Sequence, residues 1–182
     1  MYKLLLLDDE QPILSALRRV ISRIPPQRLD GGCSMATFTD PAQALDSLRD
    51  EPCDLILADY RLPGMDGLDF LRRAIEIQPD VARIVISGQA DLPVVLSAIN
   101  DARVFRFVSK PWSDAELQLC IVQALQDCTL RRENQRLADL VRSQQNALSR
   151  HEAALRQLEA ECPGITQVVR DESGAIFIDE DD

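Results

Sequence analysis

Acidic side chains follow two largely apolar runs of the sequence. Residues 3–7 are followed by Asp8 and Asp9, and residues 54–58 are followed by Asp59. Clustered carboxylates repel one another, and proteins commonly relieve this repulsion with a hard divalent cation that takes oxygen ligands. The three carboxylates therefore predict a cation site, provided that the fold brings the two run ends together.

Two further apolar runs lead to polar side chains. Residues 81–86 are followed by Ser87, and residues 104–108 lead to Lys110. A cation neutralises the charge that develops on a transferred phosphoryl group, and a lysine adds a point charge to a phosphate oxygen. A carboxylate can act as the nucleophile and form an aspartyl phosphate. Together these residue types indicate phosphoryl-transfer chemistry.

The segments that must position these side chains alternate between strand-like and helix-like patterns from residue 1 to residue 112. Strands are predicted at residues 3–7, 33–38, 54–58, 81–86 and 104–108, and helices at residues 12–21, 41–48, 68–77 and 93–102. This alternation predicts an α/β fold, a doubly wound five-stranded parallel sheet with right-handed crossovers. Short connections favour a flavodoxin-like strand order, in which sites form in a crevice at the carboxyl ends of the strands.

A long helix is predicted after residue 112, because residues 113–162 contain neither Gly nor Pro. As one helix they would span about 75 Å. The first part has the spacing of a face packed on a sheet: Leu117, Cys120, Ile121, Ala124 and Leu125. A heptad pattern follows, with Asp127, Asn134, Val141, Leu148 and Leu155 at position a, and with Leu130, Leu137, Gln144, His151 and Leu158 at position d. Asn134 favours a parallel dimer, whereas Gln144 and His151 weaken the seam.

Residues 163–182 begin with Pro163 and Gly164, which end the predicted helix. Two short β-like runs around a turn then predict a small hairpin, which is marginal unless it docks on something. The chain carries a net charge of −10, and six acids without a base lie in residues 171–182. An acidic chain without a basic block argues against direct contact with nucleic-acid phosphates.

Cysteine usage and hydropathy set the expected compartment. The five cysteines are scattered and form no C-x-x-C motif, as expected for reduced thiols in a cytosolic protein. No apolar run approaches the length of a membrane span, and the N-terminus lacks a signal-peptide pattern. We therefore expect a cytoplasmic protein that does not contact the membrane.

Residues 1–125 resemble a bacterial response-regulator receiver domain. The motifs that carry the resemblance follow the predicted strands in the order that the family shows: Asp8-Asp9, Asp59-x-x-x-Pro63-Gly64-Met65-Asp66-Gly67, Ser87-Gly88 and Lys110-Pro111. The resemblance implies that Asp59 accepts a phosphoryl group from a sensor histidine kinase. It further implies that Ser87 is the switch hydroxyl, that Lys110 pairs with the phosphoryl group, and that Phe107 is the switch aromatic residue.

The resemblance also implies a Mg²⁺ cofactor. Its direct ligands would be the carboxylates of Asp9 and Asp59 and the backbone carbonyl of Arg61, with Asp8 contributing mainly through water. Taken singly, most of these residues have a plainer interpretation as capping acids, surface charges, turn residues or core residues. Asp66, for example, is expected to cap the helix that follows it.

Three functions remain open from the sequence. The first is a receiver domain (1–125) without a catalytic output of its own. It would signal by protein–protein contact through a dimeric coiled-coil helix (126–162), continuous with the fifth receiver helix, and an acidic tail (163–182). The second is the receiver and coiled-coil front end of a larger regulator. Its output enzyme, either a cyclic di-GMP enzyme or a phosphatase, would be absent from this chain. The acidic ending favours the first. A Mg²⁺-dependent phosphatase would need a second acid and a substrate cap, and the loop after Asp59 offers only Asp66.

Overall fold

The computed structural model describes residues 1–29, 31–88 and 104–162. The chain divides into two units, Met1–Glu133 and Asn134–Asp182. The helix expected at 93–102 and the hairpin expected within 163–182 lie outside the described residues.

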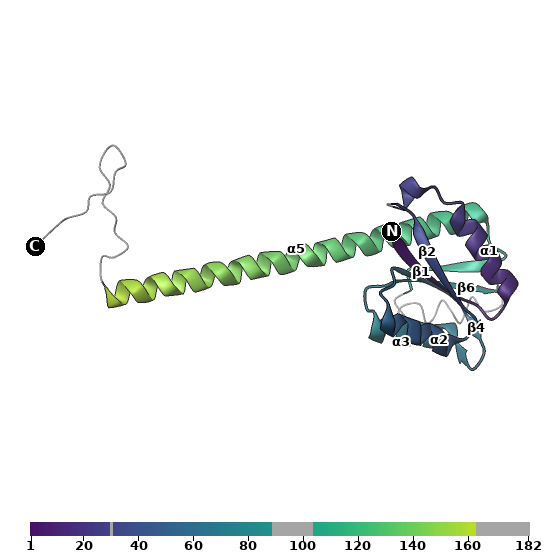
Figure 1. Cartoon of the computed structure of the whole chain (residues 1–182), viewed down its shortest axis with the longest axis horizontal. Coiled ribbons are helices and arrows are strands. Elements are labelled where there is room, and N and C mark those ends of the chain that lie inside the picture. Colours follow the sequence, from purple (N-terminus) through teal and green to yellow (C-terminus); the bar gives the residue numbers. More distant parts are fainter. Residues whose placement is uncertain (30, 89–103, 163–182) are drawn as a thin grey trace, which may run out of the picture. The chain divides into compact units, whose positions relative to one another are not determined.

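The first unit is built on a parallel sheet (Figure 1). Its elements, with the helix that leads into the second unit, are β1 (Tyr2–Leu7), α1 (Gln11–Ser22), a short 3-10 helix (Pro26–Arg28), β2 (Cys33–Phe38), α2 (Pro41–Asp50), β3 (Leu55–Asp59), β4 (Arg61–Leu62), β5 (Met65–Asp66), α3 (Gly67–Ile77), β6 (Ala82–Gly88), β7 (Arg106–Lys110) and α5 (Asp114–Glu161). Five strands form the main sheet in the order β2-β1-β3-β6-β7, and every neighbouring pair is parallel. The predicted flavodoxin-like fold is confirmed.

Helices cover both faces of this sheet (Figure 1). On one face, α1 and the first part of α5 enclose an aliphatic cluster that includes Leu17, Leu57 and Ile121. On the other face, α2 and α3 enclose a second cluster that includes Leu45 and Phe70. Every residue of β3 is buried, as expected for a central strand between two helical layers. The site-bearing strand ends are therefore fixed by packing from both sides.

Aspartates cap two of the helices next to the sheet. The carboxylate of Asp40 accepts a hydrogen bond from the backbone N–H of Ala42 at 2.8 Å, at the start of α2. That of Asp66 accepts one from the backbone N–H of Asp69 at 2.7 Å, at the start of α3. The Asp66 cap agrees with the sequence analysis. Both side chains satisfy backbone donors that have no partner in the first helical turn.

The loop after β3 contains a small hairpin that the sequence pattern does not predict. Strands β4 and β5 pair across a turn in which Gly64 has a φ of 79°. Gly67 then begins α3 directly against the end of β3, where an added Cβ would lie 2.1 Å from the carbonyl oxygen of Asp59. Only glycine fits that position, so the hairpin and Gly67 together fix the backbone around Asp59.

The last strand lies two residues later than predicted. β7 spans Arg106–Lys110 rather than 104–108, and Lys110 pairs in register with Gly88 of β6. Lys110 is consequently part of the sheet instead of the loop after it, and its side chain starts from a backbone fixed by strand pairing.

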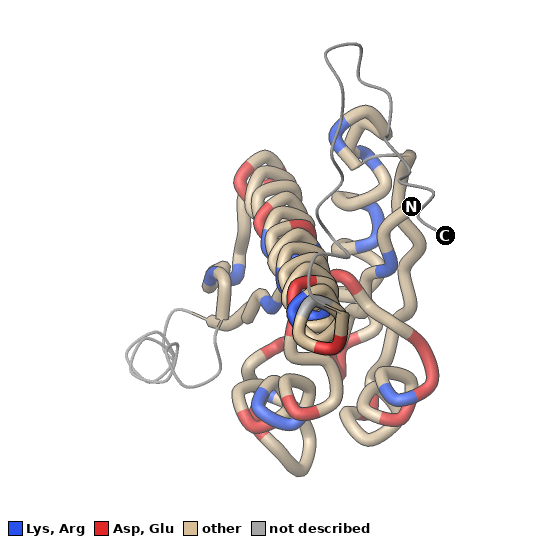
Figure 2. Tube along the Cα trace, turned by 90° about the vertical axis from the view of Figure 1, so that its left-hand side faces the viewer, with Lys and Arg blue, Asp and Glu red and all other residues tan. Residues whose placement is uncertain are grey.

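Helix α5 is one continuous helix, as predicted. In the first unit its predicted sheet-facing residues are buried: Leu117, Cys120, Ile121, Ala124 and Leu125. In the second unit its leucines are exposed, and acidic and basic residues both occur along its length (Figure 2). Among the helices within the described ranges, none combines the length and the apolar character that a membrane span requires.

Candidate functional site

Three strands place buried polar side chains at the carboxyl edge of the sheet. Asp8 follows β1, Asp59 ends β3 and Ser87 lies near the end of β6. Asp8 is 1% exposed, Asp59 5% and Ser87 1%. Burying charge without compensation is costly. Two buried carboxylates on neighbouring strands therefore require a positive partner.

Lys110 supplies that positive partner. Its Nζ lies 2.8 Å from Oδ2 of Asp8 and 2.6 Å from Oδ1 of Asp59. The remaining oxygens accept backbone hydrogen bonds, Asp8 Oδ1 from the N–H of Glu10 at 2.9 Å and Asp59 Oδ2 from the N–H of Arg61 at 2.8 Å. Both carboxylates are thus held in one orientation, and the three side chains carry a formal net charge of −1.

The pKa shifts at the site follow from burial and these contacts. Burial raises the pKa of Asp8, and the hydrogen bond from Lys110 opposes this rise without cancelling it. Burial alone would lower the pKa of Lys110, but its hydrogen bonds to Asp59 and Asp8 outweigh that effect and raise it. Lys110 is therefore an ammonium at neutral pH, available to bind an anionic group.

The structure brings together only some of the predicted metal ligands. Asp8 and Asp59 meet at Lys110, whereas Asp9, the residue after Asp8, is exposed. Arg61 begins β4 and contacts Asp59 through its backbone N–H. Within the described residues, no three acidic, histidine or cysteine side chains are grouped as a metal site. The donor chemistry nevertheless fits Mg²⁺, because all the donors are hard oxygens and the cluster carries net negative charge.

The two predicted switch residues occupy different environments. Ser87 is buried and pairs in register with Ser109 of β7. It directly follows Ile86, the residue of β6 that pairs in register with Asp59. Phe107 is half-buried and packs against the apolar cluster under α2 and α3. Ser87 therefore lies at the carboxyl edge of the sheet, on the strand next to that of Asp59, whereas Phe107 packs on the face of the sheet that α2 and α3 cover.

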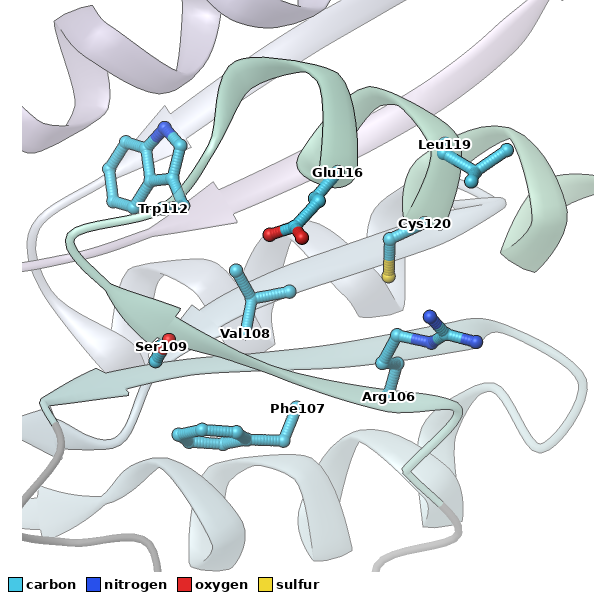
Figure 3. A pocket seen from close by; sticks show the side chains of 8 residues that line it. All are labelled: Arg106, Phe107, Val108, Ser109, Trp112, Glu116, Leu119 and Cys120. Atoms are coloured by element: carbon cyan, nitrogen blue, oxygen red, sulfur yellow. The ribbon is translucent and has the colours of Figure 1, made fainter.

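Two hollows lie along β7 and the start of α5. One, of about 870 Å³, is lined by Arg106, Phe107, Val108, Ser109, Trp112, Glu116, Leu119 and Cys120 (Figure 3). The other, of about 440 Å³, is lined by Ile13, Ala16, Lys110, Pro111 and Trp112. The second hollow directly borders the site, because Lys110 belongs to both. Ile13 and Ala16 could not be assigned to this neighbourhood from the sequence, since only the fold brings α1 beside Pro111.

The model of the response regulator receiver domain family matches residues 4–122. The chain belongs to this family. The strand-end acids, Ser87 and Lys110 all lie within the matched part of the receiver domain.

Two characterised relatives are longer regulators. The receiver chain is 32% identical over 133 residues to the hydrogenase transcriptional regulatory protein HoxA of Cupriavidus necator, covering 73% of this chain and 26% of that protein. It is 29% identical over 147 residues to the response regulator protein TodT of Pseudomonas putida, covering 81% of this chain and 61% of that protein. The chain thus spans from about a quarter to three-fifths of these relatives.

Solved structures show the same fold. The signal receiver domain of an HD domain-containing protein from Pseudomonas fluorescens Pf-5 is 34% identical, with a TM-score of 0.65, covering 72% of this chain and 92% of that one. A protein described as uncharacterized, from Neptuniibacter caesariensis, is 40% identical, with a TM-score of 0.66, covering 73% of this chain and 93% of that one.

Proposed function

We propose that Asp59 accepts a phosphoryl group from a sensor histidine kinase in a Mg²⁺-dependent reaction, and that the domain signals by protein–protein contact. The observation that carries this proposal is the contact of one ammonium, Lys110, with two buried carboxylates at the carboxyl edge of a receiver sheet. A buried charge cluster of this kind is costly to maintain, so a chemical role accounts for its presence.

In the proposed reaction, an oxygen of Asp59 attacks the phosphorus of a phosphohistidine on the kinase. The O–P bond forms as the P–N bond breaks, and the histidine side chain leaves and takes up a proton. The backbone N–H of Arg61 holds the carboxylate in place, and Lys110 offers its ammonium to the incoming phosphoryl oxygens. Mg²⁺, held by Asp9, Asp59, the Arg61 carbonyl and, through water, Asp8, would neutralise charge on those oxygens.

The acyl phosphate would change the charge balance of the site. The acyl phosphate would carry about two negative charges where the Asp59 carboxylate carries one, and it adds new acceptor oxygens, so Lys110 gains a stronger partner than Asp8. Ser87, on the neighbouring strand, supplies a hydroxyl to another phosphoryl oxygen in this proposal. Phe107, which packs on the face of the sheet under α2 and α3, would change its side-chain position in response.

The hollow beside Lys110 is the proposed kinase contact. Ile13, Ala16, Pro111 and Trp112 present apolar surface next to the ammonium. A helical partner that carries a phosphohistidine could pack on this surface while the phosphoryl group reaches Asp59. The chain would form a homodimer through α5 and pass the signal to a downstream protein partner. This would take place in the cytoplasm, where the five free thiols would stay reduced.

A second function is favoured by the lengths of the relatives. The match covers only 26% of HoxA and 61% of TodT. The chain is also 35% identical over 117 residues to the cyclic di-GMP phosphodiesterase response regulator RpfG of Xanthomonas campestris, of which it covers 29%. In this alternative, the receiver and helix form the front end of a larger regulator with an enzymatic output. Identifying a further domain encoded in frame with the chain would favour it.

The proposed reaction is tested by incubating the chain with a small phosphoryl donor, acetyl phosphate, in the presence and absence of Mg²⁺. Intact-mass spectrometry should show one added phosphoryl group only when Mg²⁺ is present. The Asp59→Asn variant should show none, and Asp50→Asn, at an exposed position at the end of α2, should behave as wild type. Phosphorylation of the Asp59→Asn variant would refute the assignment.

A further inference from the structure

The exposed side of α5 in the second unit carries a mixed apolar and polar seam. The seam consists of the residues at heptad positions a and d from residue 134 to residue 158: Asn134, Leu137, Val141, Gln144, Leu148, His151, Leu155 and Leu158. Its large apolar members are between 48% and 63% exposed. A helix with so much apolar surface in water needs a partner.

We propose that a second copy of this chain packs on the seam in parallel and in register, and that three polar layers select this alignment. The layers are those of Asn134, Gln144 and His151. The inference rests on the homodimer proposed above, and it adds which face, which direction and which residues define the interface.

Charge pairs do not select the alignment of the two helices. In a parallel coiled coil, the residue at position g lies near position e of the next heptad on the partner helix. Those pairs are Glu133 with Ala138, Leu140 with Gln145, and Ala147 with Glu152. None of them joins opposite charges, so the selectivity must come from the seam itself.

The parallel, in-register alignment places like against like in every layer. Each of Asn134, Gln144 and His151 faces its own copy, so each polar side chain finds a hydrogen-bonding partner across the interface. Each leucine of the seam also faces a leucine. The neighbouring Leu140 at position g, 52% exposed, widens the apolar contact beside Val141.

Other alignments lose either polar or apolar partners. An antiparallel pair centred between residues 142 and 143 places Val141 against Gln144 in both halves. Sliding it by one heptad pairs Asn134 with Gln144, but leaves Leu155 and Leu158 outside the partner's seam. A parallel shift of one heptad places Asn134 against Val141 and Leu137 against Gln144. Burying a polar group against an apolar one costs more than burying it in a matched polar layer, where the two polar side chains can hydrogen-bond to each other.

Crosslinking of Cys162 can show whether the two helices of the dimer run parallel or antiparallel. Cys162 is exposed and lies seven residues after Leu155, at the next a position. In the proposed dimer the two copies of Cys162 are neighbours, whereas in either antiparallel alignment they lie at opposite ends. In one experiment, the full chain is oxidised with copper phenanthroline and examined for disulfide-linked dimers. In a separate experiment, the mass of the full chain is measured by light scattering under reducing conditions.

We expect a two-chain mass and conversion of most of the chain to a disulfide-linked dimer, which Cys162→Ser abolishes. In the Cys162→Ser background, Leu155→Cys should restore crosslinking, and Asn146→Cys, at outward position f, should not. A monomer would refute both the homodimer and this inference. A dimer in which neither Cys162 nor Leu155→Cys crosslinks, or a larger assembly, would refute the alignment alone.

A second variant tests the role of the polar layers. Asn134→Leu should raise the thermal midpoint of the helix, because an apolar layer replaces a polar one, but should yield more than one mass or reduce crosslinking through Cys162. If Asn134→Leu keeps both the two-chain mass and full Cys162 crosslinking, the polar layers do not select the alignment.

Discussion

Replacing Lys110 with methionine removes the ammonium that contacts both buried carboxylates while keeping a side chain of similar length. Removing one partner of a buried ion pair typically costs about 3–5 kcal/mol. The Lys110 side chain is 21% exposed, so water screens part of this loss. The variant can also take up a proton on one carboxyl group, which would cost about 4 kcal/mol at pH 7 for a carboxyl of ordinary pKa.

Asp8 can take up this proton, because burial already raises its pKa and the variant lacks the opposing hydrogen bond from Lys110. We therefore expect Lys110→Met to lower the free energy of unfolding by about 2–3 kcal/mol at pH 7. A carboxyl whose pKa is raised by folding binds more protons in the folded state than in the unfolded state. Stability then rises as pH falls, so the deficit of the variant should shrink between pH 7 and pH 5.

The assay is urea unfolding followed by the fluorescence of Trp112, the only tryptophan, at the two pH values. A matched control is Lys3→Met, because Lys3 pairs with Glu51 at 2.9 Å, but both side chains are largely exposed. That exposed pair should leave the free energy of unfolding nearly unchanged. Equal effects of the two substitutions, or a deficit for Lys110→Met that does not depend on pH, would refute the electrostatic account of the site.

Three further outcomes are expected. Mg²⁺ should raise the thermal midpoint of the wild-type chain and raise that of Asp9→Asn less, as read by circular dichroism, because a ligand of the folded state stabilises it. Gly67→Ala should destabilise the fold by about 3 kcal/mol in urea unfolding, since the new Cβ overlaps the carbonyl oxygen of Asp59. Thiol titration at pH 8 should modify Cys162 quickly and Cys53, whose pKa burial raises to about 11, only after unfolding.

Strand ends were the most predictable part of this receiver domain. Each apolar run has an abrupt polar end, and parallel strands share one carboxyl edge, so Asp8, Asp59 and Ser87 could be assigned to one site without coordinates. The sequence pattern predicts the end of β7 two residues too early, because Ser109 and Lys110 are polar. Strand pairing with β6 continues through them regardless of side-chain polarity.

Contacts across the sheet were beyond the sequence pattern. The contact of Lys110 with both carboxylates depends on the register of three strands, which no local pattern specifies. Arg83 is another example, because it lies in an apolar run and yet is 2% exposed, with its guanidinium donating to the carbonyl oxygen of Pro79 at 3.2 Å. Burial of such a group follows from its position in a covered central strand.

In the proposed dimer, helix α5 packs on the sheet with one set of residues and on the second copy with another, because the residue types at its heptad positions change along its length. With Asn134 at position a, the residues buried against the sheet fall mainly at b, e and f, whereas the seam uses a and d. After residue 134, positions b and f hold polar residues or alanine, so the sheet-packing face does not continue. Before residue 126, the d positions hold the polar residues Glu116 and Gln123, and Cys120 at position a is buried against the sheet, so the seam does not extend into the receiver core. Substitutions at Asn134 and Cys162 therefore change the proposed interface without altering the core that positions Asp59.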